Sequence, residues 1–137
     1  ADADWLVSLI NNIDSKYVGA LPDFGDYNFC MKRGALDFED IEKVCENQYD
    51  KYMGVEKLMP YAKGVSAKSH YFDAKGEETS TDFSRMLKII LNSNYKGYLT
   101  IEYEGAMAGM HGSEKNDYLS PNDGVKATQN LLNKYIG

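Results

Sequence analysis

Three short strand-like segments, separated by helical patterns, constrain this fold more than any other feature of the sequence. They span residues 17–23, 64–69 and 97–104, and the last is the strongest because β-branched and aromatic residues lie between glycines. Strands that alternate with helices predict parallel β-α-β units with right-handed crossovers. The expected fold class is therefore α/β, and both a (β/α) barrel and an open doubly wound sheet satisfy the order.

Amphipathic patterns predict the helices between these strands. Helices are expected near the amino terminus after Asp2 or Asp4, after Asp37, from about residue 50 to 59, over 83–91 and after Ser120. The expected buried face of the first helix comprises Trp5, Leu6, Leu9, Ile10 and Ile13, that of the second Ile41, Val44 and Cys45, and that of the last Val125, Thr128, Leu131, Leu132 and Ile136.

The composition disfavours several classes of partner. A net charge of -6 over 137 residues argues against nucleic acid and anionic membrane, because both need clustered Lys and Arg. No apolar run approaches the roughly 20 residues of a membrane-spanning helix. Neither a GxGxxG motif nor a P-loop follows a predicted strand, which counts against dinucleotide binding. Cys30 and Cys45 form no CxxC pair, so we expect two reduced thiols in a cytoplasmic protein.

Polar side chains lie where each predicted strand ends. Asp23 ends the first segment, Lys68 ends the second, and Glu102 and Glu104 end the third. In parallel α/β folds, ligands bind beyond the carboxyl ends of the strands. We therefore expect Asp23, Lys68 and Glu102 to point into a common hollow.

Each of these residues also has a purely structural interpretation. Asp23 and Gly25 form an Asp-x-Gly pattern that is common in turns. Glu102 and Glu104 share one face of a strand, where they repel unless a cation or a base lies between them, or where they lie on a solvated edge strand. A lysine at Lys68 is costly in a buried strand unless it meets a carboxylate, a phosphate or a metal-bound oxygen, although its stem can also carry it to water.

Three motifs in sequence order resemble a known family. They are LPDFGDYN from Leu21, LMPYAKGVSAKS from Leu58 and GYLTIEYEG from Gly97. Together they resemble sugar phosphate isomerases/epimerases of the xylose isomerase-like barrel superfamily, over nearly the whole chain. That superfamily includes ketohexose epimerases, inosose dehydratases and metal-dependent apurinic endonucleases. The resemblance implies that residues 1–137 are one partial domain, the C-terminal portion of a TIM-type (β/α) barrel with about three βα units.

The resemblance also implies a divalent metal, such as Mn, Mg, Co or Zn, held by Glu, Asp, His and Glu from the last four strands. Asp23 matches the Asp and Glu102 the final Glu, whereas the first Glu would lie upstream of Ala1. Ser66 stands where the family has its His, and Lys68 fits the lysine of the same pattern. Two carboxylates alone bind a divalent ion poorly by comparison with a full set of ligands.

The implied activity is metal-assisted proton transfer next to a carbonyl of a small sugar or sugar phosphate. Glu102 and Lys68 are the expected catalytic residues. The expected substrate-binding residues are Lys32, Arg33, Ser66, His70 and Glu104, and His111 is a weaker candidate.

Two other functions remain open at this stage. A non-catalytic binding protein on a decayed barrel is one, and Ser66 in place of His favours it. A metal-dependent phosphodiesterase related to apurinic endonucleases is the other, although that class normally carries several His ligands.

The number of strands also leads to an expectation about assembly. A complete barrel takes about 250 residues, and three strands leave two open sheet edges. We therefore expect a fragment that is inactive alone and that either self-associates or requires a missing N-terminal half.

Overall fold

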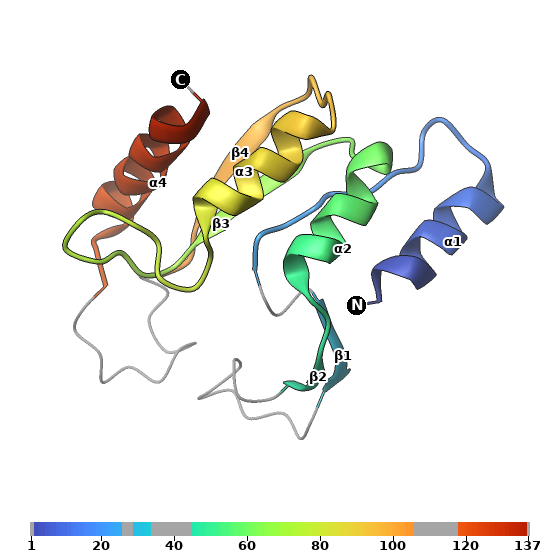
Figure 1. Cartoon of the computed structure of the whole chain (residues 1–137), viewed down its shortest axis with the longest axis horizontal. Coiled ribbons are helices and arrows are strands. Elements are labelled where there is room, and N and C mark those ends of the chain that lie inside the picture. Colours follow the sequence, from blue (N-terminus) through green and yellow to red (C-terminus); the bar gives the residue numbers. More distant parts are fainter. Residues whose placement is uncertain (1, 26–28, 34–44, 106–117, 137) are drawn as a thin grey trace.

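Helices and strands alternate along the chain, and the structure belongs to the α/β class (Figure 1). The computed structural model describes residues 2–25, 29–33, 45–105 and 118–136. The helices are α1 (Ala3–Ile13), α2 (Lys51–Leu58), the 3-10 turn η3 (Met59–Tyr61), α3 (Phe83–Asn92) and α4 (Pro121–Ile136). The strands are β1 (Cys30–Arg33), β2 (Cys45–Gln48), β3 (Val65–Ser69) and β4 (Leu99–Tyr103).

The parallel sheet contains the three segments that the sequence predicted. β3 and β4 pair in parallel, from Val65 opposite Leu99 to Ser69 opposite Tyr103. Residues 17–23 run parallel to the other edge of β3 through bridges from Ala20 to Ala62 and from Asp23 to Ser66.

The segment 17–23 is not a continuous strand, and proline gives the reason. The Ala20 N–H donates to Tyr61 O at 2.9 Å, and the Ser66 N–H donates to Pro22 O at 2.9 Å. Pro22 has no N–H to donate in return, so the ladder is interrupted between the two bridges. The order across the sheet is nevertheless residues 17–23, β3 and β4.

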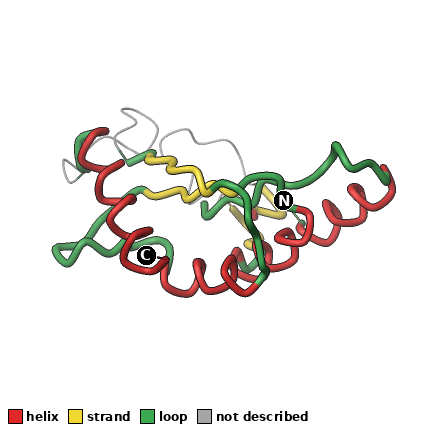
Figure 2. The backbone as a smooth tube through the Cα atoms, turned by 90° about the horizontal axis from the view of Figure 1, so that it is seen from above, coloured by secondary structure: helices red, strands yellow, loops and turns green. Residues whose placement is uncertain are grey.

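The helices form a row along one face of this sheet, with α1, α2, α3 and α4 packed each against the next (Figures 1 and 2). Val65 and Ala67 of β3 have no exposed surface and pack into the core beneath α3. Phe24 and Phe83 meet there edge to face, with ring centroids 5.3 Å apart. Gly124 lets α4 approach β4, because a Cβ atom at that position would lie 2.2 Å from the Tyr103 ring.

Four of the five predicted helix starts are confirmed, and the fifth, after Asp37, lies outside the described residues. The carboxylate of Asp2 accepts from the backbone N–H groups of α1, and Asp50 and Asp82 do the same for α2 and α3. The hydroxyl of Ser120 accepts from the Asp123 N–H at the start of α4 and donates to the Asp123 carboxylate. Among the described residues, no helix is long and apolar enough to cross a lipid bilayer.

The predicted buried stripes of α1 and α4 are only partly right. Ala3 and Ile10 are the buried residues of α1, whereas its remaining large apolar side chains lie partly or largely at the surface. The exposed members of the two predicted stripes are Trp5, Leu9, Ile13, Val125 and Ile136, at 63%, 39%, 46%, 45% and 43%. Helical periodicity gives a face but not its partner, and α1 lies at the end of the described row with one neighbouring helix.

A separate antiparallel pair contradicts two expectations. β1 and β2 pair from Cys30 opposite Gln48 to Arg33 opposite Cys45, so Cys45 lies in a strand and not in the predicted helix. The rest of that predicted helix, from Asp37 to Val44, lies outside the described residues. Cys30 is disulfide-bonded, and Cys45 is the other cysteine of the chain. The prediction of two reduced thiols is wrong because spacing along the sequence did not reveal that the two segments pair side by side.

Candidate functional site at the carboxyl ends of the parallel strands

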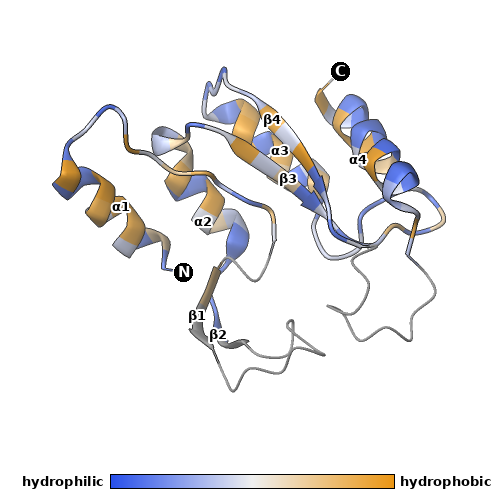
Figure 3. Cartoon of the chain, turned by 180° about the vertical axis from the view of Figure 1, so that it is seen from behind, coloured by the Kyte–Doolittle hydropathy of each residue, from blue (hydrophilic) through white to orange (hydrophobic). Residues whose placement is uncertain are grey.

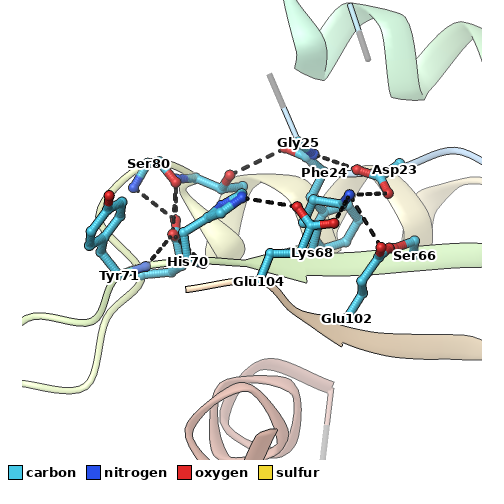
Figure 4. A network of polar contacts seen from close by, with 12 residues as sticks. Asp23, Phe24, Gly25, Ser66, Lys68, His70, Tyr71, Ser80, Glu102 and Glu104 are labelled. Carbon is cyan, nitrogen blue, oxygen red and sulfur yellow. Dashed lines mark hydrogen bonds and ion pairs between the residues drawn. The ribbon is translucent and has the colours of Figure 1, made fainter. Parts of the chain in front are cut away.

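Lys68 lies at the centre of a polar cluster (Figure 4). Its Nζ atom is 2.9 Å from Glu104 Oε1, 3.3 Å from Glu102 Oε1 and 3.7 Å from Asp23 Oδ2. These carboxylates come from the segment 17–23 and from the end of β4, on either side of β3. The structure thus brings together Asp23, Lys68 and Glu102, as the sequence predicted. We call Lys68, its three carboxylate partners Asp23, Glu102 and Glu104, and the neighbouring Ser66 and His70 the Lys68 cluster.

The Lys68 cluster lies on the sheet face opposite the core. Side chains alternate along a strand, so the buried Val65 and Ala67 place Ser66 and Lys68 on the other face. Figure 3 shows β3 and β4 changing from hydrophobic to hydrophilic residues toward these ends. His70 and Glu104 directly follow β3 and β4, so this part of the cluster lies at the carboxyl ends of the strands, where parallel α/β folds bind ligands.

Asp23 makes the turn that the sequence suggested and also lies beside Lys68. Its Oδ1 atom accepts from the Gly25 N–H at 2.7 Å, which makes the Asp-x-Gly turn. Its side chain is 14% exposed and also pairs with Lys68. Burial raises the pKa of Asp23 above its ordinary value, and it outweighs the Gly25 N–H and the Lys68 charge, which act in the opposite direction.

Glu102 is held by Ser66 and Lys68 together. The Ser66 hydroxyl donates to Glu102 Oε2 at 2.6 Å. Burial raises the pKa of Glu102, but the Ser66 hydrogen bond and the Lys68 charge outweigh it, so the pKa is below its ordinary value. The side chain is 42% exposed, because β4 is the outermost described strand of the sheet.

Lys68 and His70 complete the cluster. Burial lowers the pKa of Lys68, but the Glu104 hydrogen bond and the three carboxylate charges outweigh it, so the pKa is raised. His70 Nε2 lies 3.4 Å from Glu104 Oε2, and the His70 side chain is 13% exposed. Glu104 therefore bridges Lys68 and His70, a contact that strand alternation alone did not reveal.

Glu78 lies next to the cluster and was not among the residues predicted from the sequence. Glu78 is 7% exposed and accepts from the backbone N–H groups of His70 and Tyr71, each at 3.2 Å. Its position in the loop before α3 carries no recognisable motif. The one available signal was an acid just before Ser80 and Thr81, a pattern that local turns also produce.

The structure does not bring every predicted residue to the cluster. The backbone of Lys32 and Arg33 lies in β1, which belongs to a different sheet, and their side chains lie outside the part that the structure describes. His111 also lies outside the described residues.

The donor set of the cluster does not by itself fit a divalent metal. Within the described ranges, no group of three or more His, Cys, Asp or Glu side chains is arranged to hold a metal ion. The two expected ligands, Asp23 and Glu102, are joined by the ammonium group of Lys68, and Ser66 supplies a hydroxyl where the family has an imidazole.

An apolar pocket of about 280 Å³ lies on the outer side of residues 21–23. Its walls are Asp2, Ala3, Leu6, Leu21, Asp23, Phe29 and Leu58. Asp23 is the residue that this pocket and the Lys68 cluster share.

Comparisons with known proteins assign no family, because no family model and no curated protein matches the chain.

Proposed function

We propose that this chain is the C-terminal part of a (β/α)-barrel enzyme of the sugar isomerase/epimerase type. The proposal combines the resemblance of the three motifs with one structural observation. That observation is the meeting of Asp23, Lys68 and Glu102 at the carboxyl ends of three neighbouring parallel segments. Two carboxylates, each within 4 Å of the same ammonium group, suit proton transfer next to a carbonyl.

Glu102 is the acid/base group in this proposal. Its carboxylate takes the proton from the carbon next to the carbonyl, the C–H electron pair forms the new double bond, and the carbonyl electron pair moves onto oxygen. The Lys68 ammonium then donates a hydrogen bond to the enediolate oxygen. A proton delivered to the same carbon from the opposite face, by the opposing carboxylate that the resemblance implies, completes an epimerisation. Protonation of the neighbouring carbon, with its hydroxyl proton passing to the other enediolate oxygen, completes an isomerisation. The lowered pKa keeps Glu102 ionised and ready to accept the proton near neutral pH.

The metal implied by the resemblance requires more than this cluster. Asp23 and Glu102 would be two of its ligands, and the others would come from outside the described residues. No step above depends on it, because Lys68 already supplies a positive charge beside both carboxylates.

The charges of the cluster favour an unphosphorylated ligand. Three carboxylates surround one ammonium group, at 2.9 to 3.7 Å. Sugar hydroxyls can donate to these carboxylates, whereas a phosphate would be placed against all three. Like charges placed side by side cost up to several kcal/mol. A small free ketose is therefore the substrate class that the geometry supports best.

Binding experiments with the complete chain test this function. We expect D-fructose to bind at least about ten times more tightly than D-fructose 6-phosphate, because like-charge repulsion disfavours the phosphate. Lys68→Met and Glu102→Gln should each weaken binding of D-fructose by about tenfold. The control is Glu56→Gln, an exposed acid on α2, which should bind as the wild type does. Absence of sugar binding by the wild type would contradict the proposal.

Catalysis requires the rest of the site. The opposing carboxylate that the resemblance places upstream of Ala1 is the second acid/base group. We therefore expect negligible isomerase activity from residues 1–137 alone. Robust turnover of a sugar by this chain would contradict that part of the proposal.

A binding protein on a decayed barrel is the second candidate. Two observations favour it, namely the Ser66 hydroxyl on Glu102 and the 42% exposure of the Glu102 side chain. Solvent deuterium distinguishes the two candidates once the rest of a barrel is supplied. Incorporation at the carbon next to the carbonyl favours the enzyme, and sugar binding without incorporation favours the binding protein.

The disulfide changes the proposed compartment. The expectation of a cytoplasmic protein assumed reduced thiols. Cys30 is disulfide-bonded, and such bonds are rare in the cytosol and common in oxidising compartments. An oxidising compartment is the proposal that this bond supports.

A further inference from the structure

Glu78 is a buried acid that the proposed proton transfer does not use. Of the described acidic residues, it is the one that is more than nine-tenths buried, at 7% exposed. A buried carboxylate costs several kcal/mol unless it is well hydrogen-bonded. The neighbouring residues therefore have to provide hydrogen-bond donors, and these donors show which segments of the chain the carboxylate holds in place.

The donors to Glu78 come from two stretches of chain. The first is the pair of residues that follow β3, because the N–H groups of His70 and Tyr71 both donate to Glu78 Oε1 at 3.2 Å. The second stretch precedes α3. Ser80 donates through its N–H at 2.8 Å and its hydroxyl at 2.7 Å, and the Thr81 N–H also donates. One carboxylate thus joins the end of β3 to the start of α3.

The same stretch also reaches the Asp23 turn. The Thr81 hydroxyl donates to Phe24 O at 3.3 Å, and Lys51 Nζ donates to that hydroxyl at 2.9 Å and to Ser80 O at 2.7 Å. Phe24 follows Asp23 directly. The segment fixed by Glu78 therefore contacts both sides of the Lys68 cluster, at His70 and beside Asp23, in one connected network (Figure 4).

We propose that Glu78 is a positioning residue for the Lys68 cluster. Glu78 holds the backbone of His70 directly, which keeps His70 beside Glu104, and it holds the Asp23 turn through Thr81. This inference deepens the proposed function. It rests on that function for the claim that the cluster binds a sugar, whereas the contacts of Glu78 with the cluster do not depend on it. If Glu78 only stabilised the fold, replacing it would lower the free energy of unfolding and leave the geometry of the cluster unchanged. Supporting residues of this kind typically change affinity or activity by about 10-fold or more when removed.

The test compares Glu78→Gln with Glu77→Gln in the complete, isotope-labelled chain. Glu77 is the adjacent acid, but its side chain is 33% exposed and pairs with Lys134, so it is a matched control. NMR reports the ring nitrogens of His70 and the carboxyl carbon of Asp23 without any ligand. We expect Glu78→Gln to shift both signals and to weaken D-fructose binding by about tenfold. Glu77→Gln should leave the signals and the affinity unchanged.

A second variant keeps the proposal testable if Glu78→Gln does not fold. Thr81→Val preserves the shape of the side chain and removes its hydroxyl, so it should shift the Asp23 signal and leave His70 in place. A folded Glu78→Gln protein with wild-type His70 and Asp23 signals would overturn the proposal, as would Thr81→Val with an unchanged Asp23 signal. Absence of sugar binding by the wild type would contradict the proposed function alone, because the NMR signals are read without sugar.

Discussion

At the scale of single residues, the chemistry of Lys68 was predictable and its nearest partner was not. A lysine inside a short apolar strand has to meet a negative group, and Asp23 and Glu102 were expected there from their places at strand ends. Strand alternation puts Glu104 on the same face, but it does not say that Glu104 Oε1 lies closest to Lys68 Nζ, at 2.9 Å. Glu78 was missed because its role depends on backbone N–H groups, which are present in every sequence.

The lowered pKa of Glu102 predicts a dependence of stability on pH. A carboxyl group whose pKa is lower in the folded state stabilises the fold above its ordinary pKa of 4.5, and this contribution is lost as the pH falls through the folded value. Glu102→Gln lacks the contribution at every pH. The difference in unfolding free energy between wild type and variant should therefore shrink between pH 7 and pH 3.

Urea unfolding at a series of pH values measures this difference. We expect it to be a fraction of a kcal/mol at pH 7, because the Glu102 side chain is 42% exposed and solvent screens its ion pair. Glu56→Gln provides the baseline for an exposed acid. A difference between wild type and Glu102→Gln that stays constant over this range would contradict the lowered pKa.

At the scale of elements, the sequence predicted most helices and both strands of the parallel ladder. Capping residues and the 3.6-residue period act locally, so α1, α2, α3 and α4 begin where Asp2, Asp50, Asp82 and Ser120 indicate. The antiparallel pair β1 and β2 was missed because it depends on a contact across residues 34–44. Pairing between distant segments is not encoded in any local pattern.

The amphipathic helix α3 provides a matched pair of substitutions. Leu87 is 1% exposed and packs in the core, whereas Leu91, one turn later, is 52% exposed. Leu87→Ala should lower the unfolding free energy by about 2–5 kcal/mol, because it removes buried methyl groups and leaves a cavity. Leu91→Ala should change it by less than about 0.5 kcal/mol. Thermal or urea unfolding measures both, and equal effects would mean that Leu91, near the end of α3, is buried as fully as Leu87.

At the scale of the whole molecule, no described strand pairs with the outer edge of residues 17–21, near α1. Five large apolar side chains are exposed there: Trp5, Leu9, Ile13, Tyr17 and Leu21, the last two at 84% and 64%. The apolar pocket adjoins the same edge through Leu21. An uncovered sheet edge flanked by apolar side chains favours association with another chain.

We therefore predict that the chain self-associates in a concentration-dependent way. Leu21→Lys should weaken association by about tenfold or more, because it loses the burial of a leucine and adds a charge to the edge. The control is Met53→Lys, which adds the same charge at a 44% exposed apolar residue of the helix α2. Sedimentation or light scattering over a range of concentrations measures the effect. A strict monomer at high concentration would contradict the prediction.

The measurement that tests the central claim most directly is the NMR titration of the Lys68 ammonium group in the wild type, Asp23→Asn and Glu102→Gln. The claim is that three neighbouring parallel segments bring these charges together on one face of the sheet. It predicts a Lys68 pKa above the ordinary value of 10.5 in the wild type, because the carboxylate contacts outweigh burial, and a lower pKa in each variant. A wild-type pKa at the ordinary value that neither substitution changes would show that the three side chains do not meet.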